Sequence, residues 1–320
     1  MPGWPDRSQK NLIQAAEIRE ACNNVRDHIR SSFSITGLYV GTPKPRKQPM
    51  NIISFNTNSI RMRLHQLKSI IDRLDPDVIG IQESKVCDED FPFDDIAELG
   101  YHAEVHGQKT HYGVALLSKT KPEQVFKGLP DEAGDAQRRL IGAAYQDPKL
   151  GKVTVINGYF PQGENRNHPT KFPNKVAFYE RLNLLLETRF TPSENILVIG
   201  DMNIASVDED IGIGADNQKR WLREGKTSFL PEERAWLQKL YDWGLTDTYR
   251  HLHPSGNDRF SWFDYRSKGF EREPRRGLRI DLILASQPML KKLTKADIDY
   301  EARAMVKPSD HCPIWATFKG

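Results

Sequence analysis

The chain has 320 residues, which is enough to bury one large core or two ordinary ones. Hydrophobic residues make up 38% and charged residues 28%, as in soluble globular proteins, and no apolar run is long enough for a membrane span. The formal net charge of +3 is concentrated in residues 1–49, so it does not indicate a nucleic-acid partner by itself. Three cysteines without metal-ligand spacing favour a reducing compartment over a disulfide framework.

Residues 1–49 differ in composition from the rest of the chain. An amphipathic helix is predicted within residues 9–31, and the Pro-, Lys- and Arg-rich residues 41–49 predict an extended linker. The segment lacks the continuous apolar core of a secretory signal, and its acidic residues argue against a transit peptide. We interpret it as a loosely ordered tail or an upstream translation artefact, with a basic arm that contacts nucleic acid as the alternative.

From Met50 onward, short apolar runs alternate with amphipathic stretches, which predicts a single α/β domain over residues 50–320. Helices are predicted near residues 64–74 and 178–185, and a third from Pro231 to Gly244, because proline favours a first helical turn and glycine a helix end. The predicted strands are Asn51–Phe55, Asp77–Ile81, Gly113–Leu117, Lys152–Ile156, Asn195–Ile199, Arg279–Leu284 and Pro313–Phe318.

Polar side chains stand at the ends of these predicted strands, where layered α/β domains gather their ligand and catalytic groups. Each has an ordinary structural explanation when taken alone, such as a turn, a helix cap or a buried ion pair. Together they form a set that those explanations do not account for. Its members are Asn56, Glu83, Asp201, Asn203, Asp281, Asp310 and His311.

This set of side chains favours one kind of chemistry. Carboxylate and amide oxygens are ligands for Mg²⁺ or Mn²⁺, and the sequence has no Cys/His cluster for zinc. A carboxylate that activates water and a histidine that binds a phosphoryl oxygen suit hydrolysis of a phosphodiester. A serine hydrolase is disfavoured because the chain has no Gly-x-Ser-x-Gly motif, and phosphate-loop and dinucleotide fingerprints are also missing.

Seven motifs then follow one another in a fixed order: Ser54–Asn58, Ile81–Lys85, Asn157–Gly163, Gly200–Asn203, Ser261–Lys268, Leu278–Asp281 and Lys307–His311. In this order they closely resemble the bacterial exonuclease III family of abasic-site repair nucleases. The resemblance extends essentially from Met50 to Lys319. It implies a deoxyribonuclease I-like four-layer α/β sandwich, in which two mixed β-sheets pack face to face with helices outside.

The resemblance also implies roles for individual residues. The implied role of Asp201 is to position or deprotonate water. Asn203, Tyr159 and His311 would act around the scissile phosphate, and Asp281 would hold the imidazole of His311. Glu83 resembles the principal metal ligand. The full metal-binding set implied by the resemblance is Asn56, Glu83, Asp201, Asn203, Asp310 and His311.

For DNA binding, the resemblance points to five residues. Trp262 and Phe263 resemble an aromatic wall that admits a sugar without a base, and Gln162 resembles a contact near the lesion. Arg266 and Lys268 belong to a basic cluster that could hold the DNA backbone. That cluster comprises Arg259, Arg266, Lys268, Arg272, Arg275, Arg276 and Arg279, and a second one comprises Lys219, Arg220, Arg223 and Lys226.

The implied activity is Mg²⁺-dependent incision of duplex DNA 5′ to abasic sites, with 3′-to-5′ exonuclease activity and removal of 3′ blocking groups. A monomer in the bacterial cytoplasm, associated with the nucleoid and not with a membrane, would suit it. Two alternatives stay open: a related phosphodiesterase or phosphatase that acts on phospholipid or inositol phosphate, and a DNA-binding relative without activity. Ser59 stands where the family usually has glycine, and a positive φ there would strain a serine.

Overall fold

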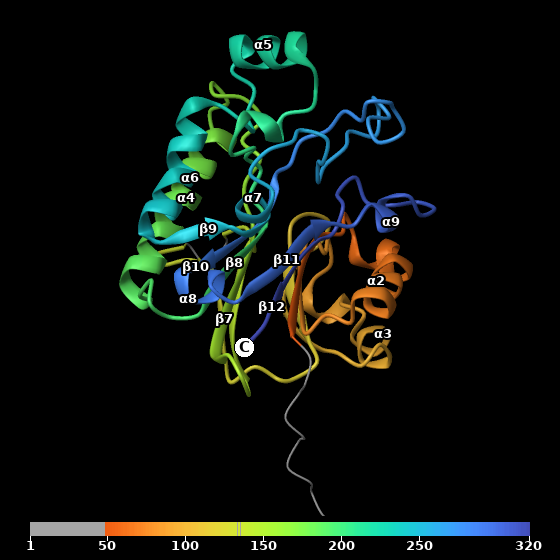
Figure 1. The fold of residues 1–320 in the computed structure, drawn as a ribbon, viewed down its shortest axis with the longest axis vertical. Helices are drawn as coiled ribbons and strands as arrows, with labels where there is room; N and C mark the ends of the chain where they lie inside the picture. Colours follow the sequence, from red (N-terminus) through yellow and green to blue (C-terminus); the bar gives the residue numbers. More distant parts are fainter. Residues whose placement is uncertain (1–48, 133, 135) are drawn as a thin grey trace, which may run out of the picture. The chain divides into compact units, whose positions relative to one another are not determined.

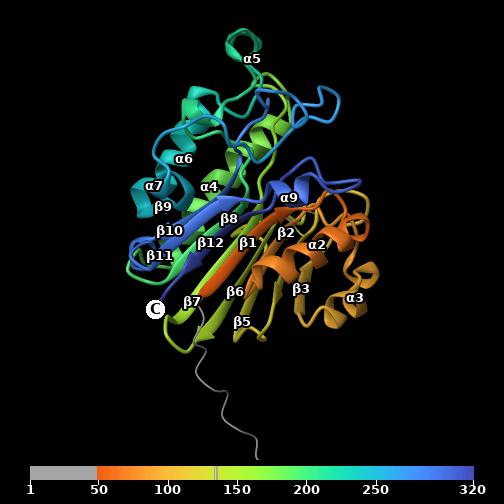
Figure 2. The ribbon, with the colours of Figure 1, turned by 45° about the vertical axis from the view of Figure 1, so that its right-hand side comes forward.

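The computed structural model describes residues 49–320, apart from residues 133 and 135. The helix predicted within residues 9–31 and nearly all of the predicted linker lie outside the described residues. Two mixed six-stranded sheets pack face to face and carry helices on their outer sides (Figures 1 and 2). This arrangement confirms the predicted four-layer sandwich.

The first sheet has the strand order β11-β12-β1-β2-β4-β3. Its central strands β1 and β2 are parallel, and the other neighbours are antiparallel. Helix α2 connects β1 to β2, so the carboxyl ends of both strands lie at the same edge. The strands are β1 (Met50–Asn56), β2 (Val78–Gln82), β3 (His102–His106), β4 (Val114–Ser118), β11 (Leu293–Ile298) and β12 (Ile314–Phe318).

The second sheet has the order β5-β6-β7-β8-β10-β9. Its parallel pair is β7 and β8, joined through helix α4, and the remaining pairs are antiparallel. Each sheet therefore has one parallel pair whose carboxyl ends point in a common direction. The strands are β5 (Gln124–Lys127), β6 (Leu140–Asp147), β7 (Gly151–Tyr159), β8 (Ile196–Asp201), β9 (Leu245–Asp247) and β10 (Asp281–Ser286).

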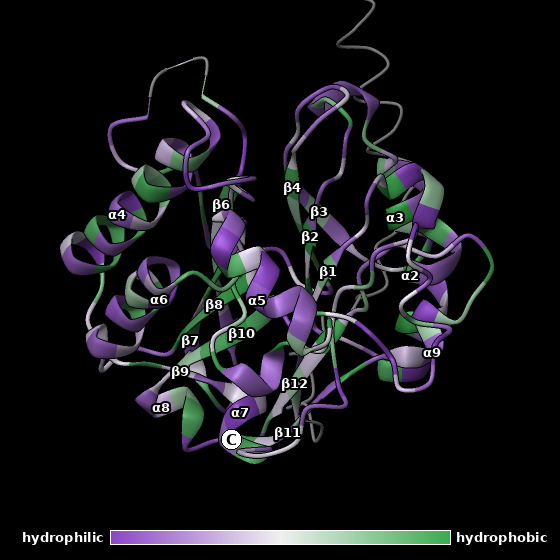
Figure 3. Cartoon of the chain, turned by 90° about the horizontal axis from the view of Figure 1, so that it is seen from above, coloured by the Kyte–Doolittle hydropathy of each residue, from purple (hydrophilic) through white to green (hydrophobic). Residues whose placement is uncertain are grey.

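Helices α2 and α3 pack on the outside of the first sheet, and α4 and α6 pack on the outside of the second (Figure 3). Among the described helices, none is both long and apolar enough to cross a membrane. The helices are α2 (Ile60–Leu74), α3 (Phe93–Glu98), α4 (Lys171–Arg189), α5 (Ala215–Glu224), α6 (Pro231–Trp243), α7 (Thr248–Leu252), α8 (Gln287–Leu290) and α9 (Tyr300–Arg303).

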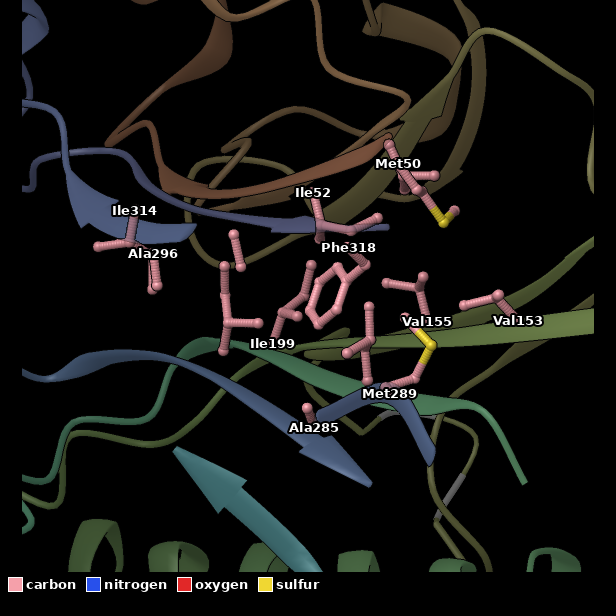
Figure 4. Close-up of a cluster of buried hydrophobic side chains, with 14 of the residues drawn as sticks. Met50, Ile52, Val153, Val155, Ile199, Ala285, Met289, Ala296, Ile314 and Phe318 are labelled. Atoms are coloured by element: carbon pink, nitrogen blue, oxygen red, sulfur yellow. The ribbon is translucent and has the colours of Figure 1, made fainter. Parts of the chain in front are cut away.

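The largest apolar core lies between the two sheets (Figure 4). Alternation along β1 divides its side chains, since Ile52 enters this core whereas Ile53 packs beneath the outer helices. From the opposite sheet, Val155 and Ile199 complete the contact. Each fully buried aliphatic side chain contributes about 1.5–3 kcal/mol, so this layer holds the sheets together.

A polar bridge crosses the same interface near the strand ends. Gln82 Nε2 donates to Asn157 Oδ1 at 2.6 Å, and Asn157 Nδ2 donates to the carbonyl oxygens of Ile81 and Ala115 at 2.9 and 3.0 Å. A Cβ atom on Gly80 would lie 2.8 Å from Asn157 Oδ1, so the sheets approach closely here. The bridge fixes the spacing of the sheets below the edge where β1, β2, β7 and β8 end.

The seven strands and three helices predicted after Met50 are present, with ends displaced by several residues. The strands that the sequence did not reveal are mostly edge or near-edge strands with polar or small residues. One is β3, whose exposed face carries His102 and Glu104, and another is β6, which contains Gly142, Ala143 and Ala144. The alternation in β3 is weak because its exposed face is polar, and β6 shows no alternation because both of its faces are buried and its central residues are small.

Candidate active site

The predicted polar residues converge at one edge of the two sheets. Asn56 ends β1, Tyr159 ends β7 and Asp201 ends β8, while Asp281 begins the antiparallel strand β10 beside the end of β8. Tyr159 and Asp201 line a cleft of about 150 Å³, whereas Asn56 and Asp281 are buried and do not line it. The residues that line it are Glu83, Tyr159, Gln162, Asp201, Asn203, Trp221, Ser228, Trp262, Leu278, Ile280, Asp310 and His311.

Asn56 links acidic groups that come from different sheets. Its Nδ2 atom donates to Glu83 Oε1 at 3.2 Å and to Asp201 Oδ2 at 3.0 Å. The second carboxylate oxygen of Glu83 pairs with Lys85 Nζ at 2.9 Å. Burial would raise the pKa of Glu83, but the Lys85 ammonium and a hydrogen bond from Tyr159 hold that pKa below its usual value.

Asp201 is buried and stands in register with a second carboxylate, Asp281, on the adjacent antiparallel strand. Burial raises the pKa of Asp201 to about 7; the His311 charge opposes this shift, whereas Asp281 and Glu83 add to it. A carboxylate with this pKa can accept a proton near neutral pH.

His311 forms an ion pair with the other carboxylate of this pair. Its Nδ1 lies 2.9 Å from Asp281 Oδ2, and its Nε2 lies 3.7 Å from Asp201 Oδ2. Burial would lower the pKa of His311, but Asp281 and Asp201 together raise it to about 10. The ring is therefore cationic at neutral pH. Ligand atoms of these three residues lie within 4.8 Å of one another, a grouping that can hold a metal ion.

Asn203 is fixed by three contacts of its backbone and side chain. Its amide nitrogen donates to Asp201 Oδ1 at 3.1 Å, its Nδ2 donates to the Phe160 carbonyl oxygen at 3.0 Å, and its carbonyl oxygen accepts from Lys175. The residue has a positive φ of 52°. These contacts orient the side-chain amide at the wall of the cleft.

Asp310 is also fixed on both oxygens. It accepts from Asn58 Nδ2 at 2.9 Å and from Trp262 Nε1 at 3.1 Å. Burial would raise the pKa of Asp310, but His311 and these two hydrogen bonds hold it below its usual value. Asp310 is thus ionised at neutral pH.

Tyr159 supplies a hydroxyl that stays protonated. Burial raises the pKa of Tyr159 well above its usual value, and the Glu83 and Asp201 charges add to this effect. The guanidinium of Arg139 lies 4.6 Å from the centre of the ring and opposes the shift. Tyr159 can therefore serve as a hydrogen-bond donor in the cleft.

The apolar wall differs from the predicted one. Trp262 lines the cleft, but Phe263 is 0% exposed and packs edge-to-face against Phe270 with ring centres 5.1 Å apart. The structure therefore does not bring Phe263 to the cleft, because successive residues of an extended segment point to opposite sides. Leu278 and Ile280 complete the wall instead. Sequence reasoning missed them, although they alternate with Arg279 directly before Asp281.

Gln162 lines the cleft, while its side chain is held by the protein, donating to Thr227 Oγ1 at 3.1 Å and accepting from the Glu164 amide at 2.7 Å. Arg266 and Lys268 are exposed on the loop that carries Trp262, outside the lining of the cleft. The structure thus places Gln162 in the lining of the cleft and leaves the charged groups of Arg266 and Lys268 outside it.

The two basic clusters meet at a second groove of about 270 Å³, next to the cleft. Trp221 and Trp262 line both cavities, and Arg220, Arg272 and Arg276 add positive charge to the groove. Arg279 is different from the other members of its cluster, because it is 1% exposed and pairs with Asp210 and Asp247. The interpretation of Arg279 as a surface contact for the DNA backbone is therefore wrong.

Ser59 takes the conformation that would strain it, with a φ of 90° and a ψ of 106° at the start of α2. Its amide donates to the Glu83 carbonyl oxygen at 2.8 Å, which explains why the loop holds this geometry. We expect Ser59→Gly to stabilise the fold by about 1 kcal/mol, because glycine adopts positive φ without strain. Thermal unfolding should show a melting temperature higher by roughly 2–4 °C.

The matched control is Ser69→Gly within the regular part of α2, where glycine should lower stability by about 0.5–1 kcal/mol. Equal destabilisation by both substitutions would contradict strain at Ser59.

Comparisons with known proteins identify the class of protein that this fold and cleft define. Residues 53–311 match the endonuclease/exonuclease/phosphatase family, and the chain belongs to that family. It is 57% identical over 270 residues to exodeoxyribonuclease III of Haemophilus influenzae, covering 84% of this chain and 100% of that protein. This confirms the predicted relation to the exonuclease III enzymes.

Solved structures give the same result. The fold is similar to that of a 3′-5′ exonuclease from Neisseria meningitidis, with a TM-score of 0.75 and 37% identity. It is also similar to an AP endonuclease from Archaeoglobus fulgidus, with a TM-score of 0.76 and 32% identity. In both cases the match covers 85% of this chain and 100% of the other.

Proposed function

We propose that this protein is a Mg²⁺-dependent DNA repair nuclease that incises duplex DNA 5′ to abasic sites. It also removes 3′ blocking groups and degrades duplex DNA from 3′ ends. One observation carries the proposal: a proton acceptor, Asp201, and a cation, His311, face the same cleft beside the apolar wall of Trp262, Leu278 and Ile280. The groups proposed to react with the phosphodiester thus lie next to an apolar surface that suits a sugar without a base.

The oxygen donors around Asn56 fit a hard divalent cation. Glu83 and Asp310 are held ionised, and Asn56 lies against the Glu83 carboxylate. Mg²⁺, with Mn²⁺ as a substitute, would be held by these groups together with Asp201 and Asn203, and would neutralise charge that develops on the phosphate. His311, the sixth member of the predicted set, could bind the ion only through Nε2 and only after losing its proton, because Nδ1 is paired with Asp281.

Side chains in and beside the cleft carry out proton transfer and bind the phosphate. Asp201 takes a proton from the attacking water, which Asn203 helps to orient. His311 and Tyr159 donate hydrogen bonds to phosphate oxygens, where negative charge increases as the bond to water forms. Asp281 holds the imidazole in place at 2.9 Å and keeps it protonated.

Substrate choice follows from the wall of the cleft. A deoxyribose that has lost its base exposes the C–H groups of its ring, which suit contact with Trp262, Leu278 and Ile280. A solved relative, a 3′ phosphatase from Neisseria, is bound to a product DNA hairpin, which supports DNA as the substrate. This substrate also suits a monomer associated with the bacterial nucleoid.

An incision experiment tests the proposal. The full chain is incubated with Mg²⁺ and a duplex that carries one tetrahydrofuran lesion, and a duplex with an intact base serves as the control. We expect cleavage 5′ to the lesion, loss of cleavage in EDTA, and recovery when Mg²⁺ or Mn²⁺ is added in excess. The same experiment on a chain that starts at Met50 measures the contribution of residues 1–49.

Two outcomes would contradict the proposal. Faster hydrolysis of an inositol phosphate than of the abasic duplex would favour a phosphatase, because the carboxylates and His311 suit either substrate. Binding to the abasic duplex without metal-dependent cleavage would instead favour a DNA-binding protein without activity.

A further inference from the structure

A fully buried ion pair lies behind the cleft. Lys175 on α4 and Glu233 on α6 are both 0% exposed at their side chains, and Lys175 Nζ lies 2.5 Å from Glu233 Oε1. Neither residue lines the cleft. Lysine and glutamate are almost never completely buried unless their charges are paired, so the position of this pair requires an explanation.

The ammonium group of Lys175 contacts two loops that form the wall of the cleft. Its Nζ donates to the carbonyl oxygen of Asn203 at 2.9 Å and to that of Gln162 at 3.3 Å. Asn203 has a φ of 52°, a left-handed conformation that asparagine adopts more readily than most residues and that the contacts around it hold in place. Lys175 supplies part of that restraint.

The carboxylate of Glu233 holds a third segment. Its Oε2 accepts from the amides of Ser228 and Leu230 at 2.7 and 2.8 Å. Ser228 also lines the cleft and has a φ of 98°. In addition, the Ser228 carbonyl oxygen accepts from the Ala205 amide at 2.6 Å, so the segments that contain Ser228 and Asn203 are joined directly.

The energetics of buried ion pairs favour a role in positioning. Removing two charges from water costs about as much as their attraction returns, and apolar replacements of such pairs are often neutral or stabilising. Stability alone therefore does not account for a pair at this site. The pair instead fixes three backbone segments at one wall of the cleft, those that contain Asn203, Gln162 and Ser228.

We propose that Lys175 and Glu233 are positioning residues, which together hold Asn203, Gln162 and Ser228 in the geometry that hydrolysis requires. The inference rests on the proposed nuclease function for its kinetic consequences. Its structural part, the restraint of three backbone segments by one buried pair, is independent of the substrate.

The test uses Lys175→Met, Glu233→Gln and the double variant. For Lys175→Met we expect kcat on the abasic duplex to fall between about 10-fold and 100-fold, because small displacements of positioned groups are costly. The dissociation constant for the same duplex, measured in EDTA, should change by less than about threefold, since the lost contacts orient the reacting groups. This difference between kcat and binding separates positioning from a general loss of structure.

The double variant separates positioning from stability. Lys175→Met leaves the Glu233 charge buried and alone, and should lower the melting temperature by roughly 10 °C. Removing the second charge as well should restore most of that loss but not kcat. A double variant with the kcat of the unaltered protein would overturn the proposal.

A matched control comes from an ion pair far from the cleft, that of Arg73 on α2 with Asp299, at 2.6 Å. Arg73→Met should lower the melting temperature without lowering kcat. An equal loss of kcat in this variant would assign the effect of Lys175→Met to reduced stability and overturn the proposal.

Hydrogen–deuterium exchange gives a readout without substrate. In Lys175→Met, peptides that cover residues 160–164 and 201–205 should exchange faster than in the unaltered protein and in Arg73→Met. If the unaltered protein fails to cleave the abasic duplex while this exchange increases, the proposed function fails and the positioning role stands. Unchanged exchange together with unchanged kcat would reject the positioning role alone.

Discussion

Asp201→Asn is expected to lower the rate of incision at an abasic site by at least about 10²-fold. The substitution keeps the shape of the side chain but removes the group that accepts a proton from water. Asp201 is suited to that task because burial raises its pKa to about 7. Single-turnover kinetics with Mg²⁺ and saturating enzyme measure the effect on the chemical step without interference from product release.

Thermal unfolding of the same variant serves as its control. A carboxyl group whose pKa is raised in the folded state destabilises the fold as pH rises above its unfolded pKa, near 4. An uncharged amide at position 201 is free of that penalty, so Asp201→Asn should be at least as stable as the unaltered protein at pH 8. A large drop in melting temperature would assign the loss of rate to misfolding.

Arg279→Met is expected to destabilise the fold by about 3 kcal/mol or more. Arg279 donates from Nε to Asp210 at 2.7 Å and from Nη2 to Asp247 at 2.5 Å, and Arg250 also pairs with Asp210. The four charges balance. Methionine fills much of the same volume but leaves one buried negative charge without compensation, and the melting temperature measures the cost.

The pH dependence of this effect has a definite sign. Burial would raise the pKa of Asp210, but Arg279 and Arg250 hold it below its ordinary value of 3.8. The stabilisation by this carboxylate is therefore complete above about pH 4 and is lost as pH falls through the folded-state pKa. The difference in melting temperature between Arg279→Met and the unaltered protein should therefore be larger at pH 7.5 than at about pH 3, where Asp210 loses its charge.

The exposed Arg276, three residues earlier in the chain, provides the control. Arg276→Met should change stability by less than about 0.5 kcal/mol, because the side chain is exposed. Equal effects at the two positions would contradict the assignment of Arg279 to a buried charge cluster.

The sequence predicted the part of the site that depends on local pattern. Asn56, Glu83 and Asp201 follow apolar runs in which burial on both faces is evident, so their place at the sheet edge could be inferred from strand direction alone. The side of a short segment to which a residue points was harder to infer. Phe263 and Arg279 adjoin cleft residues in sequence but face the interior, and isolated bridges, not a regular strand, set their orientation.

Buried ion pairs between residues far apart in the chain could not be predicted from the sequence. Nothing local to Lys175 marks it as buried, since it lies in an amphipathic helix where a lysine is usually exposed. Its burial depends on Glu233, 58 residues away. The same limit applies to Asp210, which in sequence is one of several acidic residues in a polar loop and in the structure is the partner of two arginines.

The bridge between Gln82 and Asn157 has a consequence for how this protein loses activity. Glu83 and Asp201 belong to opposite sheets, and only the contact between those sheets brings their carboxylates to the same amide of Asn56. Neither half of the sandwich contains a complete site. Activity therefore depends on the spacing of the two sheets. We expect an expanded state to be inactive when the layer between the sheets loosens, even if every helix and strand is kept.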